Sequence, residues 1–273
     1  MSKAIEQSIK EKLKTISKKE SLPFNQLLET LFLERFLVRI SKSKYNENFI
    51  FKGGMCLDQF LNIGRETRDL DFLLHKLEAN SEKIKTIFKE IADLDTNDGF
   101  SFGNVELGLL SIVHKKYPGF RISIVGKLGQ VKQKITVDIG VGDVVRPRVI
   151  DVELMQTHKP LFEDAIKIGA YPPEYIFSEK LEAIIHLAEI NGRMKDFYDC
   201  LSIIREVPIV KDNFKEAIQN TFSNRGTTFS HIPAYGEILG TKWNAFMSRN
   251  KIKELDLERV ILEINNFLKT LGI

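Results

Sequence analysis

The chain is poor in cysteine and has no long apolar run. Only two cysteines, Cys56 and Cys200, occur among 273 residues, and no CxxC pair is present. A disulfide framework and a zinc ribbon are therefore not expected, and a reducing compartment such as the cytoplasm fits best. No apolar segment approaches the ~20 residues that a membrane-spanning helix needs. Glu6 and Glu11 interrupt the lysine-rich N-terminal segment, which is unlike a signal peptide, so we expect a cytoplasmic protein without a membrane partner.

Common catalytic motifs are also missing. No GxxxxGK[ST] segment occurs, which excludes a Walker-type phosphate loop, and no HExxH segment occurs, which excludes that type of zinc helix. The five histidines are scattered without metal-ligand spacing. Charge of one sign is not in large excess, because the formal net charge is only +3. This balance permits a nucleic-acid partner but does not argue strongly for one.

The remaining composition is that of a globular protein, with 43% hydrophobic and 28% charged residues. Apolar residues at helical spacing predict helices over residues 5–16, 24–41, 53–64 and 80–91. Period-two segments predict strands over residues 48–51, 69–74, 105–113, 120–128 and 131–139. The last two strands form a hairpin that turns at Gly129-Gln130. From Pro172 onward the pattern is almost wholly helical, so we expect an α/β domain over residues 1–160 and a helical domain over residues 161–273, with the boundary near Lys159-Pro160.

The most informative stretch combines a glycine turn with two carboxylates. Gly53-Gly54 follows a short extended run, and Asp69-Leu70-Asp71 begins the next predicted strand. Residues two apart in a strand point to the same face and lie about 7 Å apart. Two such carboxylates can hold Mg²⁺ against phosphate oxygens, and a glycine turn lets backbone N–H groups approach a phosphate. Together these features indicate a nucleotidyl-transfer site.

A third acid lies inside a later apolar strand, Ile135-Thr136-Val137-Asp138-Ile139. An acid flanked by valine and isoleucine is costly to bury alone. Asp138 is explained if it faces a cation that it shares with Asp69 and Asp71. The alternative is that it lies in water at the end of the strand. Three acids from two strands can bind the Mg²⁺ pair that activates an attacking oxygen and stabilises the leaving pyrophosphate.

These blocks and two later ones resemble a known family. Gly-Gly, a spacer, Asp-x-Asp and then a single acid on a later strand is the layout of the polymerase-β-like nucleotidyltransferases. Four blocks are similar to the AbiEii/AbiGii toxin family: Phe51-Lys52-Gly53-Gly54 with Arg65-x-Thr67-x-Asp69-Leu70-Asp71-Phe72, Asp138-Ile139-Gly140-x-Gly142-Asp143, Ser178-Glu179-Lys180-Leu181-x-Ala183, and Arg193-x-Lys195-Asp196-x-Tyr198-Asp199. They run in the family's order and leave both ends of the chain uncovered.

The resemblance implies both a fold and an activity. The fold is α/β (α+β), a polymerase-β-like palm with a mixed sheet, followed by a C-terminal helical domain. The activity is that of a nucleotidyltransferase toxin of a toxin–antitoxin pair, with some relatives acting in abortive infection against phage. Such an enzyme transfers a nucleotide from an NTP, GTP or CTP, with Mg²⁺ to an acceptor such as tRNA or another RNA. A cognate antitoxin protein is the implied partner.

The resemblance also assigns roles by position. The catalytic residues are Asp69, Asp71, Lys180 and Asp196, and the metal ligands are Asp69, Asp71 and Asp138. The residues implied to bind the nucleotide are Lys52, Gly53, Gly54, Arg65 and Thr67. Thr67 replaces the serine of many relatives and keeps the hydroxyl. The spacing from Gly-Gly to the acids is slightly long for the wider superfamily, so a loop is expected near Arg65.

Other interpretations of these residues stay open at this point. Lys180 could be an exposed lysine paired with Glu179 or Glu182, and Asp196 and Asp199 could be acids that favour the start of a helix. Asp143 is expected to be a turn residue. The stretch Asn224-Arg225-Gly226-Thr227-Thr228 is expected to be a solvated loop, with RNA contact as the alternative.

Two other classes of function also remain. One is a small-molecule nucleotidyltransferase of the antibiotic-modifying type, built on the same palm. The other is a non-catalytic module that binds a nucleotide or an antitoxin. An acidic acceptor pocket would favour a small amine as the acceptor, whereas a basic rim would favour RNA.

Overall fold

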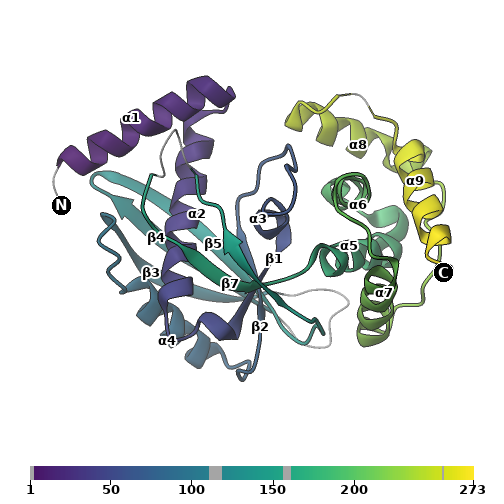
Figure 1. Cartoon of the computed structure of the whole chain (residues 1–273), viewed down its shortest axis with the longest axis horizontal. Helices are drawn as coiled ribbons and strands as arrows, with labels where there is room; N and C mark the ends of the chain where they lie inside the picture. The colour runs from purple at the N-terminus through teal and green to yellow at the C-terminus, as the bar shows by residue number, and fades with distance from the viewer. Residues whose placement is uncertain (1–2, 111–118, 156–160, 254) are drawn as a thin grey trace. The chain divides into compact units, whose positions relative to one another are not determined.

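The computed structural model describes residues 3–110, 119–155, 161–253 and 255–273 (Figure 1). The expected boundary at Lys159-Pro160 and the last three residues of the expected 105–113 strand lie outside the described residues. The chain forms two compact units. Unit 1 comprises Met1–Met55, Thr67–Gly142 and Arg148–Ala170, and unit 2 comprises Cys56–Glu66, Asp143–Pro147 and Tyr171–Ile273.

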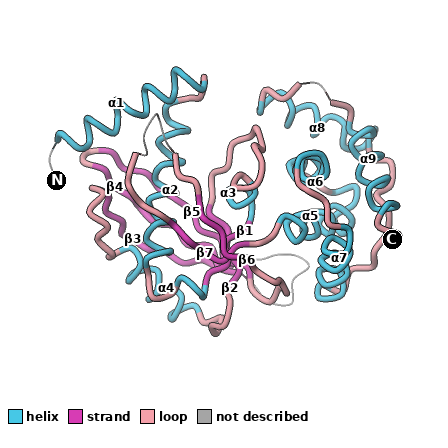
Figure 2. The backbone as a smooth tube through the Cα atoms, in the orientation of Figure 1, coloured by secondary structure: helices cyan, strands magenta, loops and turns pink. Residues whose placement is uncertain are grey.

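Unit 1 is built on a seven-stranded mixed sheet with the order β3-β4-β5-β2-β1-β7-β6 (Figure 2). The strands are β1 (Phe49–Lys52), β2 (Leu70–Leu74), β3 (Phe100–Leu110), β4 (Gly119–Leu128), β5 (Val131–Gly140), β6 (Arg148–Val152) and β7 (Ile166–Ala170). The β2–β5 and β1–β7 pairs are parallel, and the other pairs are antiparallel. The expected α/β fold with a mixed sheet is confirmed, and so is the β4–β5 hairpin. Strands β6 and β7 have no counterpart among the predicted strands.

Helices cover one face of this sheet. They are α1 (Lys3–Glu20), α2 (Phe24–Lys42) and α4 (Ser81–Ala92), and the side chain of Asn80 accepts a hydrogen bond from Lys83 N at the start of α4. Aromatic rings join the helices to the strands. Phe88 of α4 lies 6.1 Å from Phe36 of α2 and 5.2 Å from Phe49 of β1, measured between ring centroids. These contacts are part of the apolar core of unit 1. The Phe49 ring in turn lies 6.1 Å from that of Phe72 on β2, the strand that carries Asp71.

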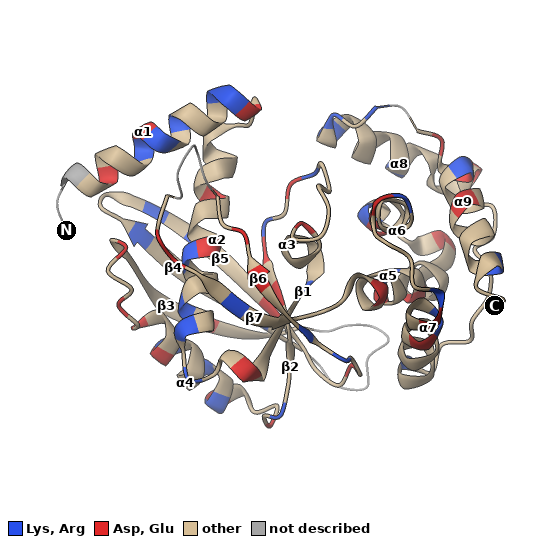
Figure 3. Ribbon diagram, in the orientation of Figure 1, with Lys and Arg blue, Asp and Glu red and all other residues tan. Residues whose placement is uncertain are grey.

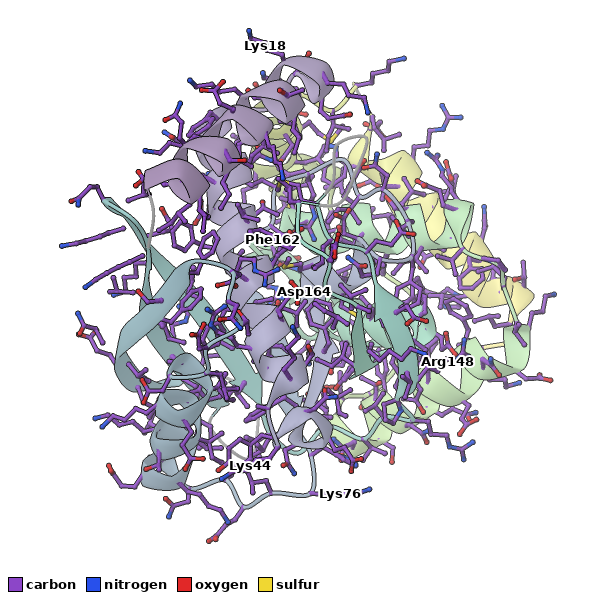
Figure 4. The ribbon with its side chains drawn as sticks, turned by 60° about the vertical axis from the view of Figure 1, so that its left-hand side comes forward. Lys18, Lys44, Lys76, Arg148, Phe162 and Asp164 are labelled. Atoms are coloured by element: carbon purple, nitrogen blue, oxygen red, sulfur yellow. The ribbon has the colours of Figure 1, made fainter. Side chains whose placement is uncertain are left out.

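Two buried arginines of α2 tie later segments of unit 1 to this helix. Arg35 and Arg39 both donate to Asp98, with Nε–Oδ2 and Nη1–Oδ2 distances of 2.7 and 2.8 Å. Arg35 also donates to Asp164 at 2.6 Å, and its guanidinium stacks 4.1 Å from the centroid of the Phe162 ring (Figure 4). These contacts fix the segments before β3 and before β7 on α2.

The expected helix over residues 53–64 is wrong in length, because α3 spans only Gly53–Leu57. Beyond it, side chains bind backbone N–H groups of the following loop. Asp58 accepts from Ile63 N at 3.4 Å, and Asn62 accepts from Gly64 N at 2.9 Å. Such local hydrogen bonds compete with helix formation and here favour a turn.

Unit 2 is helical, as the sequence predicts. Its helices are α5 (Pro173–Leu187), α6 (Met194–Glu206), α7 (Lys211–Arg225), α8 (Gly236–Asn250) and α9 (Leu257–Thr270). Phe177, Phe214 and Phe267 form the aromatic centre of the unit, with ring centroids 5.3 to 5.6 Å apart in edge contacts. Among the described helices of both units, none has the length and the apolar composition that crossing a membrane requires.

Candidate active site

The three predicted acids of unit 1 come together at the ends of neighbouring strands. Asp71 of β2 lies directly opposite Asp138 of the parallel strand β5, and Asp69 precedes the first residue of β2. One carboxylate oxygen from each lies within 4.8 Å of the others, and all three side chains are half-buried. In the described parts of the chain, no other three His, Cys, Asp or Glu residues converge in this way. Closely spaced carboxylates suit a hard divalent cation. We refer to Asp69, Asp71 and Asp138 as the acid trio.

Strand register places the acids within a row of charges on one face of the sheet. Lys52 of β1 lies opposite Asp71, Asp71 opposite Asp138, and Asp138 opposite Arg121 of β4. Residues directly opposite one another on paired strands point to the same face. From β1 through β2 and β5 to β4, the side chains in this row are therefore basic, acidic, acidic and basic. This arrangement places a cationic side chain at each end of the pair of acids.

Arg121 is a site residue that the sequence motifs do not indicate. Its Nε and Nη2 donate to the two carboxylate oxygens of Asp138 at 2.8 and 2.6 Å. The Arg121 side chain is 54% exposed, whereas that of Asp138 is 13% exposed, so the reading of Asp138 as a water-exposed acid is wrong. Hydrogen bonding to Asp138 and the fields of Asp69 and Asp71 raise the pKa of Arg121 despite its partial burial. The β4–β5 hairpin could have revealed it, since a turn at residues 129–130 pairs position 121 with position 138.

The glycine turn lies against the acid trio. Gly53 has a φ of +74°, a conformation that side-chain-bearing residues rarely adopt. A Cβ atom at Gly53 would lie only 2.0 Å from Asp71 Oδ2, so a larger residue would collide with this carboxylate. Gly54 follows it in the buried first turn of α3.

Thr67 is a further feature of unit 1 that suits a ligand. Its Oγ1 atom is buried and has no hydrogen-bond partner among the described residues. A buried hydroxyl without a partner is unfavourable, because its hydrogen bonds to water are not replaced. A phosphate oxygen or a metal-bound water would supply that partner. The acids, the glycine turn and this hydroxyl together fit a metal–nucleotide group.

A second charged cluster lies within unit 2. Lys180 of α5 contacts two acids of α6, with Nζ–Oδ distances of 3.0 Å to Asp196 and 2.7 Å to Asp199. Arg65 donates to both oxygens of Asp199 at 2.8 and 2.6 Å. Arg193 donates to Asp196 at 2.6 Å. Five charged side chains thus form one network.

Burial in this cluster overturns two of the open interpretations. The Lys180 side chain is 9% exposed and both acids are fully buried, so neither an exposed lysine nor simple helix-end acids describes them. Burial disfavours ionisation of Asp196, but Lys180 and Arg193 outweigh it and lower the pKa of Asp196 to about 2. Burial likewise opposes the charge of Lys180, yet Asp199 and Asp196 raise its pKa. Lys180 and Asp196 are therefore both ionised at neutral pH.

A third network gives Arg225 and Asp143 buried partners that the sequence pattern did not predict. Arg225 at the end of α7 pairs with Asp143 at 3.1 Å, Glu179 at 3.1 Å and Glu182 at 2.7 Å. The Arg225 and Asp143 side chains are buried, and Thr227 donates to Glu182 at 2.6 Å. Asp143 is therefore part of a buried ion-pair network. Asn224, Gly226 and Thr228 are exposed, as expected of a solvated loop, but the side chain of Arg225 is buried in ion pairs.

The predicted site residues therefore fall into two groups. The acid trio, Lys52, Gly53, Gly54 and Thr67 belong to unit 1, and Arg65, Lys180 and Asp196 belong to unit 2. Each group is assembled from segments far apart in sequence. Their roles in catalysis stay predictions.

The sequence and the fold were compared with protein families, curated proteins and solved structures. Residues 35–263 match the model of the family described as the nucleotidyl transferase AbiEii toxin of type IV toxin–antitoxin systems. Among curated proteins, none matches the chain. The structure resembles JHP933 from Helicobacter pylori, with a TM-score of 0.53, 14% identity and coverage of 90% of this chain and 91% of that chain. It also resembles MenT4, a nucleotidyltransferase toxin from Mycobacterium tuberculosis H37Rv, with a TM-score of 0.56, 14% identity and coverage of 95% and 98%.

At this level of identity, the likeness to the solved structures shows a shared fold. The family match goes further, because it spans most of the chain and includes both groups of predicted site residues. The chain therefore belongs to the AbiEii family of toxins from type IV toxin–antitoxin systems and is a nucleotidyltransferase.

Proposed function

We propose that the protein transfers a nucleoside monophosphate from an NTP, GTP or CTP, to the end of an RNA acceptor such as tRNA, and that the metal is Mg²⁺. The acid trio carries this proposal, since three carboxylates converge within 4.8 Å beside a glycine turn. Oxygen ligands at this spacing suit Mg²⁺. Bound there, the cation would polarise phosphoryl oxygens and activate the acceptor hydroxyl.

Residues of unit 1 seat the nucleotide in this proposal. The turn at Gly53-Gly54 lets backbone N–H groups approach the phosphates, and Thr67 Oγ1 donates to a phosphate oxygen. The positive φ of Gly53 and the buried, unpartnered hydroxyl of Thr67 support these roles. Lys52, opposite Asp71 on the same face, places positive charge beside the phosphates.

Residues of unit 2 stabilise negative charge in this proposal. Lys180 neutralises charge that develops on the leaving pyrophosphate, an effect that is strong when the group is held in advance. Two buried carboxylates hold its ammonium group, at 3.0 and 2.7 Å, which supports that role. Asp196 acts through Lys180 and is therefore a positioning residue. Arg65 holds Asp199 in turn and supplies further positive charge for the phosphates.

Family membership supports the proposed antitoxin partner and the proposed biological role. As a toxin of a type IV system, the enzyme is restrained by a cognate antitoxin protein, and a role in abortive infection follows from the same relationship. Both cysteines are buried free thiols, which suits the reducing cytoplasm.

The other two classes of function have less support. A non-catalytic module has no need for three converging acids, and these are intact here. A small amine acceptor calls for an acidic acceptor pocket, whereas the exposed cations that extend from the trio along β4 and β5 favour RNA.

A direct test uses α-labelled NTPs, Mg²⁺ and total tRNA. We expect the wild type to label RNA, and Asp69→Asn and Asp71→Asn to lower the rate by a factor on the order of 10³, because each removes a metal ligand. Asp151→Asn on β6 is a matched control, since this exposed acid pairs only loosely with Lys167 at 3.7 Å. The proposal fails if the wild type labels no RNA, or if the Asp69 and Asp71 variants label it as fast as the control.

A further inference from the structure

On one face of the β4–β5 hairpin the described side chains are half-buried or exposed, and the opposite face is mostly buried. Phe120, Ile122, Ile124 and Leu128 of β4 are buried, whereas Arg121 and Lys127 between them are exposed. On β5, Ile135, Val137 and Ile139 are buried, and Lys132 and Lys134 are exposed. Strand alternation thus places the cations on the face opposite α2 and α4. We name Arg121, Lys127, Lys132 and Lys134 the basic sheet face.

This face is continuous with the acid trio. Successive pairs along the hairpin are Arg121 with Asp138, Ser123 with Thr136, Val125 with Lys134, and Lys127 with Lys132. The face begins at the third acid and follows the strands for six residues, about 20 Å at the usual rise. Blue segments of the ribbon mark lysine and arginine positions on these strands (Figure 3).

The lysines of the basic sheet face are only weakly compensated by acidic side chains of the described strands. Lys134 lies 4.0 Å from Glu106 of β3, and both side chains are more than 60% exposed, so this pair contributes little. Lys127 and Lys132 lie directly opposite one another, and neither forms an ion pair with another described residue. Like charges directly opposite in a sheet are destabilising. A bound polyanion would relieve this repulsion.

We propose that the basic sheet face binds the sugar-phosphate backbone of a single-stranded RNA acceptor, whose terminal hydroxyl reaches the acid trio. This inference rests on the proposed function and places its acceptor. Lysine, arginine, serine and threonine side chains suit phosphate and sugar oxygens. On β4 and β5 as described, this face has no aromatic side chain on which a base could stack, so we expect binding that is insensitive to base sequence.

The experiment reverses three charges at positions outside the catalytic machinery. The variant is Lys127→Glu/Lys132→Glu/Lys134→Glu. The matched control is Lys83→Glu/Lys85→Glu/Lys89→Glu, which makes the same charge change on α4, on the covered side of the sheet. Anisotropy of labelled single-stranded RNAs of several sequences gives the dissociation constant at a series of salt concentrations.

We expect the hairpin variant to bind every RNA at least about tenfold more weakly, and its salt slope to fall by about 2, since each single-strand phosphate contact contributes ~0.7. The control keeps the wild-type slope. Thermal unfolding and NTP binding of both variants show whether the sheet and the nucleotide site are intact. If the slopes of both variants equal that of the wild type, or if both fall equally, the proposal is overturned. Tighter binding of polyglutamate than of RNA by the wild type also overturns it, in favour of an acidic protein partner.

The outcome for the basic sheet face is separable from that for the proposed function. One outcome is that the wild type labels RNA while the hairpin variant binds and labels RNA with an unchanged KM. That result would contradict the role of the basic sheet face in RNA binding and would leave the proposed nucleotidyl transfer to RNA supported. If the wild type binds RNA through this face but labels only a small molecule, the proposed acceptor is wrong and the binding surface stands.

Discussion

Arg121 lies directly opposite Asp138 across the β4–β5 hairpin and binds both of its carboxylate oxygens. Three carboxylates within 4.8 Å repel one another, and Arg121 offsets part of that repulsion. The same guanidinium opposes a metal ion, because a fixed positive charge beside a cation site raises its energy. We therefore expect Arg121 to stabilise the acid trio without metal and to weaken metal binding there.

Arg121→Gln should bind Mn²⁺ more tightly than the wild type, by roughly tenfold, because the competing charge is gone. Electron paramagnetic resonance of free Mn²⁺ measures this without any turnover. Arg121→Lys is the matched control, since it keeps the charge and loses the two-point geometry. An Arg121→Gln affinity equal to or weaker than that of the wild type would show that Arg121 orients Asp138 for the metal instead.

Gly53→Ala should abolish nucleotidyl transfer. An added Cβ would lie 2.0 Å from Asp71 Oδ2, and the φ of +74° is strained for alanine. Gly226→Ala is a close control, because Gly226 has a similar φ of +67° but nothing within 4 Å of an added Cβ. Both variants should lose ~1 kcal/mol of unfolding free energy from backbone strain, and only Gly53→Ala should lose activity as well.

Circular dichroism melts and the RNA-labelling assay separate these effects. Equal activity of the two alanine variants would mean that Asp71 moves aside without consequence. In that case, the close packing of Gly53 against the acid trio is incidental to catalysis.

The strands of unit 1 show what the sequence could predict and what it could not. Apolar residues predicted β4, β5 and β2, and the Asp69-Leu70-Asp71 pair together with the single acid of the later strand pointed to the acid trio. The hairpin turn also fixed the position opposite Asp138, but an arginine on an exposed strand face resembles an ordinary solvated residue. β7 was missed because it is short and is held by its parallel pairing with β1, more than a hundred residues earlier in the chain.

The ion pairs among the buried charges of unit 2 could not be predicted from neighbouring residues in the sequence. Lys180 looks exposed in sequence because Glu179 and Glu182 flank it. Its actual partners are on α6, and one of them is bound by Arg65, 134 residues before Asp199. Arg225 was misread for the same reason, since Asp143 lies 82 residues away. Only the folded chain shows that such partners meet.

Lys180→Met should destabilise unit 2 strongly. The change leaves Asp196 and Asp199 buried with one cation fewer, and removing one partner of a buried ion pair costs about 3–5 kcal/mol. Lys180→Met/Asp196→Asn removes one negative charge as well and should recover part of this stability. Urea unfolding of both variants and of Asp196→Asn completes a double-mutant cycle.

The RNA-labelling activity of these variants distinguishes a catalytic role of Lys180 from a purely structural one. If Lys180 neutralises charge on the leaving pyrophosphate, the double variant stays inactive although part of its stability returns. Recovery of activity together with stability would show that Lys180 only holds the fold.

The stability difference between wild type and Asp196→Asn should depend on pH in the acid range. The folded-state pKa of Asp196 is about 2, below the unfolded value of ~3.9, so its ionised form is favoured by folding. This contribution, ~2 kcal/mol, is fully present above about pH 4 and is lost as pH falls from 4 to 2. Urea unfolding at intervals from pH 6 to pH 2 measures it, with exposed Asp151→Asn as the control that should show little change. A difference that is constant over this range would mean that Asp196 ionises as readily in the unfolded chain as in the fold, and that Lys180 and Arg193 do not favour its charged form.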